Sequence, residues 1–201
     1  MKLYYSPGAC SLADHIALLE AGLGFDLARV ELKSKTTASG ANFNIINPKG
    51  YVPALVLDDG EMITENVAVL DWIATQHPAQ GVQGHLGRTR LLEMLVYIST
   101  EVHKSFKPFF AGKSDEEKST AQMLILKRLR FLADRMPGKY LFGNQPTVAD
   151  FYLFVMLRWA ANAGITVPNE LSVLRARMMD RPHVQAAIEF EEAPAKRVRG
   201  M

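Results

Sequence analysis

The only cysteine in the sequence, Cys10, lies just after a Pro-Gly pair and just before an amphipathic segment. A thiol at the start of a helix lies near free backbone N–H groups and the positive end of the helix dipole, which favour the thiolate. The position therefore predicts a reactive thiol with a lowered pKa. An inert, buried cysteine is the alternative, since free cysteines are commonly buried.

Cys10 has no second cysteine that could resolve a disulfide, because the redox pattern Cys-x-x-Cys is here Cys10-Ser11-Leu12-Ala13. If Cys10 exchanges disulfides, its partner must therefore be an external thiol. A single cysteine also suits a reducing compartment, and we expect the protein to be cytoplasmic. Asp14 and His15 follow closely, but the three residues lack a fourth ligand and a metal-site spacing, so no metal is expected.

A strand, a helix and a second strand are expected around Cys10. Residues 2–6 and 26–32 alternate apolar and polar positions, and residues 11–24 carry leucine and isoleucine at helical spacing. This pattern is typical of a βαβ unit with parallel strands. A polar connection over 33–51, containing a short helical piece, leads to the next elements.

A β-hairpin and a helix complete the first half. The hairpin spans 53–65 and turns at Asp59-Gly60, and the helix spans 66–77. We therefore expect an α/β domain over 1–77 with the order βαβ-ββα.

The second half is expected to be all-helical. Residues 78–87 are rich in glycine and read as a linker, and the helical domain covers 88–201. Thr147 and Asp150 form a capping-box pattern at the start of a segment that is apolar almost all round, which predicts a central, buried helix. The expected helices cover 88–110, 115–136, 147–164 and, as two short helices, 171–193.

Composition excludes several classes of protein. No apolar run approaches membrane-spanning length, so no membrane partner is expected. The formal net charge is +2 with both signs interspersed, and the short basic stretch at 195–200 reads as a solvated end, so no nucleic-acid partner is expected.

The sequence resembles the beta class of bacterial glutathione transferases. Five motifs carry the resemblance, in order: "MKLYYSPGACSLADHIALLEAG", "NPKGYVPAL", "ITEN", "EVHKSF" and "TVADFYLF". The resemblance implies a thioredoxin-like domain followed by a helical bundle domain. It also implies a homodimer that uses glutathione as co-substrate and no other cofactor.

The resemblance places the thiol chemistry at Cys10, which matches the family cysteine beside the glutathione sulfur and can form a mixed disulfide with it. Ser11 matches an adjacent hydroxyl with a catalytic role; a simple helix cap is the alternative. Val52-Pro53 matches a cis-proline turn that directs the Val52 backbone to the peptide ligand. An ordinary trans proline at a strand edge is the alternative there.

The charged ends of glutathione are assigned in the same way. Glu65 matches an acid for the α-amino group, and Asn66, with the helix amides, suits the γ-glutamyl carboxylate. Lys35 matches a lysine for the glycyl carboxylate. For Glu65 and Asn66 the alternative is simple capping of the helix, and for Lys35 it is a solvated lysine in a loop.

The helical half contributes the other wall of the cleft. Thr100 and the catalytic candidate His103 are implied to reach glutathione, while Lys104 and Trp159 line the electrophile pocket. A helix-surface His-Lys pair and plain core packing of the tryptophan are the alternatives. Val96 stands where many family members have an asparagine that contacts glutathione.

The resemblance implies transfer of glutathione to small hydrophobic electrophiles, accompanied by thiol–disulfide exchange through Cys10. A glutathione-dependent isomerase or reductive dehalogenase is an alternative enzyme. A non-catalytic ligand-binding protein of the same fold is the alternative of another class.

Overall fold

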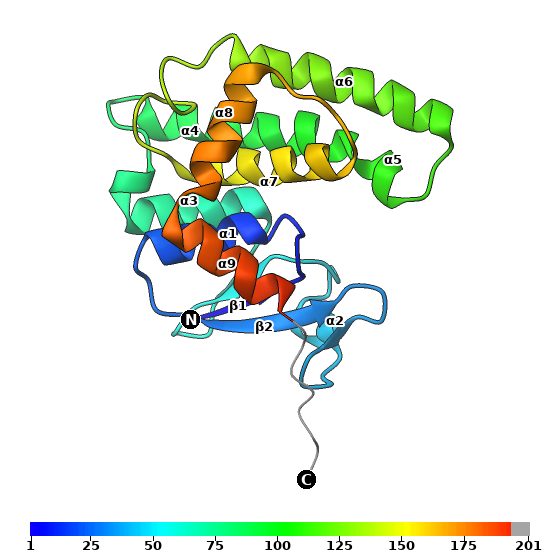
Figure 1. The fold of residues 1–201 in the computed structure, drawn as a ribbon. Helices are drawn as coiled ribbons and strands as arrows, with labels where there is room; N and C mark the ends of the chain where they lie inside the picture. The colour runs from blue at the N-terminus through cyan, green and yellow to red at the C-terminus, as the bar shows by residue number, and fades with distance from the viewer. Residues whose placement is uncertain (194–201) are drawn as a thin grey trace.

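A computed structural model of the protein describes residues 1–193. The basic stretch at 195–200 lies outside the described residues. One half of the described chain is a sheet with helices on both faces, and the other half is a helical bundle (Figure 1). The expected class, α/β followed by all-α, is confirmed.

The sheet has five strands in the order β3-β2-β1-β4-β5. In this sheet β1 and β2 are parallel, and the other three pairs of neighbouring strands are antiparallel. The short strand β3 was not expected within the polar connection. The strands are β1 (Lys2–Tyr5), β2 (Asp26–Glu31), β3 (Thr36–Thr37), β4 (Ala54–Val56) and β5 (Met62–Thr64).

Strand alternation in β1 divides side chains between two apolar layers. Leu3 and Tyr5 join the main core beneath helices α1 (Leu12–Glu20) and α3 (Asn66–Gln76). Tyr4 faces the other side, where its ring lies 5.5 Å from that of Phe43 in the short helix α2 (Phe43–Ile46).

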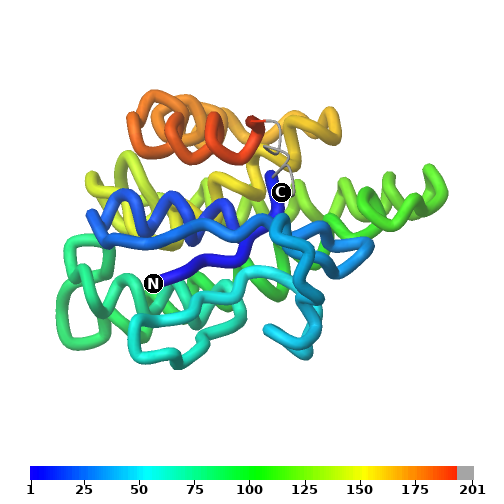
Figure 2. The backbone as a smooth tube through the Cα atoms, turned by 90° about the horizontal axis from the view of Figure 1, so that it is seen from below, coloured from blue at the N-terminus to red at the C-terminus, as the bar shows by residue number. Residues whose placement is uncertain are grey.

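The helical half packs onto the face of the sheet that α1 and α3 cover. Figure 2, seen from the sheet side, shows the strands in front of the stacked helices. The main apolar core contains residues of both halves, from Leu3 to Ile188. The elements that follow α3 are η1 (Pro78–Gln80), α4 (Gly87–Tyr97), η2 (Ile98–His103), α5 (Lys107–Phe110), α6 (Asp115–Ala133), α7 (Val148–Asn162), α8 (Asn169–Met179) and α9 (Pro182–Glu192).

The single helix expected over 88–110 is wrong: the segment forms three pieces. Helix α4 continues into η2, which is a π-helical segment, and a turn then leads to α5. A π-helical turn inserts an extra residue and rotates the side chains that follow it. Pro108 cannot donate a backbone hydrogen bond to an upstream turn, which favours a new helix start.

Helix α7 is the centre of the bundle, as its apolar sequence predicts, and it packs against α1, α3, α4, η2 and α8. Its expected capping box is confirmed. Asp150 Oδ2 accepts hydrogen bonds from the backbone N–H and the hydroxyl of Thr147, both at 2.8 Å. Asp150 Oδ1 accepts from the N–H of Leu141 at 2.8 Å. Burial nevertheless raises the pKa of Asp150 to about 6.

Helix α9 returns to the sheet half and holds the segment that carries Cys10. The buried carboxylate of Glu191 lies 3.1 Å from His15 Nδ1 and accepts a 2.9 Å hydrogen bond from the N–H of Gly8. Arg181 forms a two-pronged ion pair with Glu20 at 2.7 and 2.6 Å. Residues 1–193 contain no helix with both the length and the apolar character needed to cross a membrane.

Candidate active site

Cys10 lies in the loop between β1 and α1, and its Sγ is 3.7 Å from the backbone carbonyl oxygen of Val52. Burial and, to a smaller extent, the Asp14 carboxyl raise the pKa of Cys10 to about 12. The expected lowering of this pKa is therefore wrong. Desolvation of the sulfur outweighs the two backbone N–H groups that favour the thiolate.

Asp14 is a site residue that was read only as a poor metal ligand. It is fully buried, and neither carboxylate oxygen has a hydrogen-bond partner among the described residues. Burial raises its pKa well above the ordinary value. Its position four residues after Cys10, one helical turn away, is the sequence signal that could have identified it.

Ser11 is fully buried and does not cap α1 with its side chain. Its hydroxyl instead donates to the carbonyl of Ser6 at 3.5 Å and accepts from the N–H of Ser6 at 3.3 Å. The helix-cap interpretation is therefore wrong. These contacts close the loop that carries Cys10, and they support a positioning role in place of direct catalysis.

The peptide bond between Val52 and Pro53 is cis, as the resemblance implies. Val52 and Pro53 are both buried in the connection before β4. The Val52 carbonyl faces Cys10, so the turn brings the backbone expected to bind a peptide beside the thiol.

Glu65 lies at the start of α3 with a φ of 73° and makes no side-chain cap. Its Oε1 accepts hydrogen bonds from Lys49 Nζ at 2.6 Å and from the Tyr51 hydroxyl at 2.7 Å. These bonds hold the pKa of Glu65 below its usual value. Lys49 and Tyr51 were missed, although they flank Gly50 directly before Val52.

Lys35 and Asn66 are the two residues that the resemblance assigns to the carboxylates of glutathione. Lys35 Nζ donates to the carbonyl of Gly50 at 2.6 Å, so this lysine contacts the turn that leads to Val52. The Asn66 side chain is buried at the first turn of α3, and neither its amide nitrogen nor its oxygen has a partner among the described residues. A buried, unpaired amide is costly, which favours a polar ligand there.

His103, at the end of η2, lies with its Nδ1 2.7 Å from the Tyr152 hydroxyl of α7. Burial, and then the neighbouring Lys104, lower the pKa of His103 to about 4, so the imidazole is neutral near pH 7. Burial also raises the pKa of Tyr152, so the phenol keeps its proton and can donate it in a hydrogen bond. A phenol that donates to Nδ1 leaves the histidine proton on Nε2.

Trp159 connects this wall to the loop that carries Cys10. Its indole N–H donates to the carbonyl of Gly8 at 2.8 Å, and its ring lies 4.9 Å from that of His103. Trp159, which was expected to line the electrophile pocket, thus lies between His103 and the loop that carries Cys10.

A hollow of about 550 Å³ lies beside His103. Phe110 lines it, with its ring 4.8 Å from that of Trp159. Lys107 and Phe110 were missed, although their positions four and seven residues after His103 would place them on the same face of the continuous helix expected over 88–110. The lining residues are His103, Lys104, Lys107, Phe110 and Ala111.

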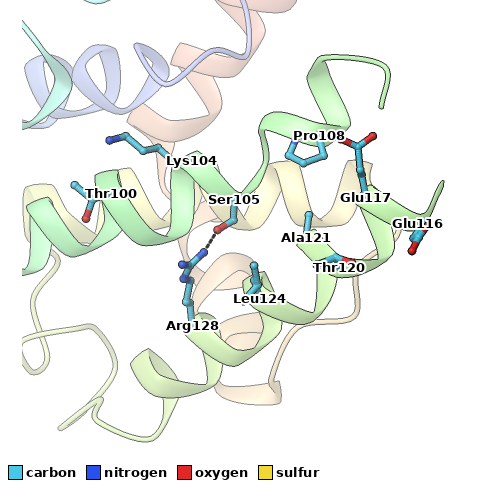
Figure 3. A pocket seen from close by; sticks show the side chains of 10 residues that line it. All are labelled: Thr100, Lys104, Ser105, Pro108, Glu116, Glu117, Thr120, Ala121, Leu124 and Arg128. Atoms are coloured by element: carbon cyan, nitrogen blue, oxygen red, sulfur yellow. Dashed lines mark hydrogen bonds between the residues drawn. The ribbon is translucent and has the colours of Figure 1, made fainter. Parts of the chain in front are cut away.

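A second hollow of about 480 Å³ lies between η2, α5 and α6 and includes Thr100 (Figure 3). The Thr100 hydroxyl donates to the carbonyl of Val96 at 2.9 Å, and no described contact joins it to Cys10 or His103. Val96 is 47% exposed, so it does not pack in the core. Figure 3 shows Ser105 and Arg128 bonded to each other, while Lys104 extends away from them.

Comparison with known proteins identifies this arrangement. Residues 9–76 match the family model described as glutathione S-transferase, N-terminal domain, and residues 115–189 match the corresponding C-terminal domain. The glutathione S-transferase GstA of Escherichia coli O157:H7 is 39% identical over 198 residues, covering 95% of this chain and 98% of that protein. This chain belongs to the glutathione S-transferase family.

Solved structures agree with this membership. BphK, a bacterial glutathione S-transferase solved as a ternary complex, superposes with a TM-score of 0.90 at 44% identity, covering 96% of this chain and 100% of that one. A beta-class glutathione S-transferase of Sphingomonas chungbukensis gives 0.88 at 42% identity, covering 96% and 99%. The resemblance to the beta class is thus confirmed, and the protein is a glutathione transferase. Residues 1–193 hold no group of three histidine, cysteine or acidic side chains placed to bind a metal ion.

Proposed function

We propose that this transferase joins the sulfur of glutathione to a small hydrophobic electrophile bound in the hollow beside His103. The observation that carries the proposal is the 3.7 Å approach of Cys10 to the Val52 carbonyl, beside an open hollow reached through Trp159 and Phe110. Glutathione lies along the Val52 backbone, with its amino group at Glu65 and its carboxylates at Asn66 and Lys35. A sphingomonad glutathione S-transferase solved with glutathione, 43% identical with a TM-score of 0.90, supports the ligand.

In the reaction the thiol of glutathione loses its proton to solvent, and the sulfur attacks the electrophilic carbon. For an aryl chloride, a carbon–sulfur bond forms, the carbon–chlorine bond breaks, and chloride leaves with the electron pair. Because Cys10 keeps its proton, its S–H can donate a hydrogen bond to the glutathione thiolate. The neutral His103 can donate from Nε2 to the same sulfur or to the developing charge.

Cys10 also supports disulfide exchange with oxidised glutathione. The Cys10 sulfur attacks one sulfur of the disulfide, the old S–S bond breaks, and one glutathione leaves with the proton that Cys10 gives up. Because the pKa of Cys10 is about 12, this reaction is slow at neutral pH.

Four further assignments belong to the proposal. The site binds glutathione and needs no other cofactor. The electrophile reaction serves detoxification, since conjugation consumes reactive compounds. The chain acts in the cytoplasm, where glutathione is reduced. The halves divide at 78–87, with domains over 1–77 and 88–201.

The protein is also proposed to be a homodimer. Helices α4 and α6 expose apolar side chains next to one another, where the ring of Tyr97 lies 5.1 Å from that of Phe131. Val96, Leu124 and Phe131 are 47%, 43% and 40% exposed. An apolar surface of this kind is typical of a protein interface.

Two measurements test the proposed function. The first is the initial rate of conjugation of 1-chloro-2,4-dinitrobenzene over the uncatalysed rate, with wild-type protein and with Cys10→Ala. The second is the intact mass after treatment with oxidised glutathione at pH 9, which should increase by one glutathione in the wild type and not in Cys10→Ala. A protein that binds glutathione but turns over no electrophile would be a ligand-binding protein instead.

A further inference from the structure

The electrophile hollow contains two cations that nothing in the described chain neutralises. Lys104 and Lys107 both line it and are both exposed, and neither forms an ion pair or hydrogen bond with another described residue. Two other lysines of the chain are paired by contrast: Lys113 lies 3.4 Å from Glu117, and Lys49 lies 2.6 Å from Glu65.

The second hollow, on the other side of η2, provides an internal comparison. Lys104 lines this hollow as well as the electrophile hollow. Its other cation, Arg128, lies 2.6 Å from Glu101 and also donates to Ser105. Glu116 and Glu117 line the same hollow. Its charges are therefore mixed and compensated, whereas the lining of the electrophile hollow contains cations and no acid.

The remaining lining of the electrophile hollow consists of two rings, His103 and Phe110, and the small side chain of Ala111. Phe110 is 62% exposed and meets the edge of Trp159 at 4.8 Å with an interplanar angle of 81°. Phe106 and His103 also meet Trp159, at 5.6 and 4.9 Å. An exposed ring beside a packed aromatic cluster offers an apolar face to a planar ligand.

His103 adds no charge of its own at neutral pH and can act only as a hydrogen-bonding group. The electrostatic character of the hollow is therefore set by the two lysines. An uncharged electrophile gains nothing from them, while an anionic one gains attraction to both.

We propose that the hollow selects aromatic electrophiles that carry an anionic group, a carboxylate or a sulfonate, with the ring against Phe110 and the anion between Lys104 and Lys107. This inference rests on the function proposed above, because it names the substrate class of the same site. The lysines are specificity residues: they bind the anionic group and take no part in breaking the carbon–chlorine bond.

The test compares two electrophiles that differ in charge alone. 4-Chloro-3,5-dinitrobenzoate is anionic, and its primary amide is uncharged and of the same size. Each kcat/KM is divided by the uncatalysed second-order rate with glutathione, and the ratio of the benzoate value to the amide value is the measured selectivity. In each reaction the carbon–sulfur bond forms, chloride leaves, and the thiol proton goes to solvent.

The wild-type selectivity should exceed about threefold and should fall as salt is raised from 0.02 to 0.5 M, because exposed charges are screened. Lys104→Gln and Lys107→Gln should each lower it by about two- to fivefold, and the double variant by more than either. Lys107→Glu should reduce it further. Lys113→Gln, which removes a paired surface lysine, is the matched control and should leave the selectivity unchanged.

Competition supplies a readout that needs no turnover of the anion. 3,5-Dinitrobenzoate has no chloride to lose, so it should inhibit conjugation of 1-chloro-2,4-dinitrobenzene more strongly than 3,5-dinitrobenzamide does. The difference should shrink in the double lysine variant.

The outcomes separate the two proposals. If neither 4-chloro-3,5-dinitrobenzoate nor its amide is turned over, the proposed function is wrong. If both are turned over with a wild-type selectivity near one, the transferase function stands and this inference is overturned. If the lysine variants raise KM for glutathione while selectivity stays constant, the lysines serve glutathione and the inference is likewise overturned.

Discussion

The hydroxyl of Tyr152, in the middle of the most buried helix, lies 2.7 Å from Nδ1 of His103 at the end of the π-helical segment η2. Neither residue lies in the sheet half that carries Cys10. The contact selects one tautomer of His103 and aims the proton of Nε2 away from Tyr152. Tyr152 is thus a positioning residue for the site.

Tyr152→Phe should lower kcat/KM for 1-chloro-2,4-dinitrobenzene by about two- to tenfold, the equivalent of one hydrogen bond of about 0.5–1.5 kcal/mol. The ¹⁵N shifts of the His103 ring should change from a single tautomer to a mixture. Tyr4→Phe, on the opposite face of the sheet, serves as the control. Unchanged ¹⁵N shifts in Tyr152→Phe would show that Tyr152 does not set the tautomer.

The stability of the protein should depend on His103 between pH 6.5 and 4. The pKa of His103 is lowered to about 4 in the folded protein, mainly by burial, so the unfolded chain takes up the proton first as the pH falls. His103 therefore lowers the free energy of unfolding as the pH falls from 6.5 to 4. Above pH 6.5 it does not change the free energy of unfolding. Urea unfolding at pH 7 and pH 4.5 should show a smaller decrease for His103→Asn than for the wild type. His85→Asn, at an exposed position, should behave like the wild type.

Asp14 should suppress the reactivity of Cys10. Replacing Asp14 by Asn removes a charge that raises the pKa of the thiol. The lower pKa should speed alkylation of Cys10 by iodoacetamide about three- to tenfold at a fixed pH below that pKa. Asp26→Asn, on the exposed start of β2, is the control. Because Cys10 is the only thiol, urea-unfolded protein supplies the unperturbed rate. Equal rates in the wild type and Asp14→Asn would exclude Asp14 as the cause.

Glu65→Gln should weaken binding of glutathione by about 1.5–3 kcal/mol, because a charge-assisted contact to the amino group is lost. The substitution also removes the carboxylate that holds Lys49 and Tyr51 together. Isothermal titration calorimetry measures the change, and Glu61→Gln in the neighbouring hairpin is the control. If Glu65→Gln binds glutathione as tightly as the wild type, the amino group is bound elsewhere.

Phe131→Glu should separate the proposed homodimer into monomers, because it places a charge in the apolar surface shared by α4 and α6. Light scattering coupled to size exclusion measures the mass. Val173→Glu, at an equally exposed apolar position on α8, should leave the mass unchanged. A wild-type protein that is monomeric at micromolar concentration would contradict the proposed assembly.

Local patterns in the sequence predicted most of the fold. Alternation in residues 2–6, the Asp59-Gly60 turn and the Thr147–Asp150 pattern each act over a few residues, and the corresponding elements formed. The π-helical turn at 98–103 was missed because no residue type marks the change from i→i−4 to i→i−5 bonding.

The chemistry of the site was harder to predict, because it depends on burial. The pKa of Cys10 was predicted to be lowered, whereas it is raised, because proximity to a helix start does not indicate how far the thiol is desolvated. Tyr152 was hidden in an apolar helix, where its hydroxyl looked incidental. The positions around Val52 were found through a family resemblance, because a cis peptide bond and a backbone carbonyl have no side-chain signal of their own.

The hydrogen bond from the Gly8 N–H to Glu191 affects the order in which the enzyme folds during synthesis. During synthesis, Gly8 in the loop with Cys10 leaves the ribosomal exit tunnel 183 residues before Glu191, whose carboxylate anchors that loop. The N-terminal half can fold as it emerges, yet its catalytic loop must wait for α9 before it is secured. A nascent chain arrested before α9 would therefore hold a folded sheet without a finished site.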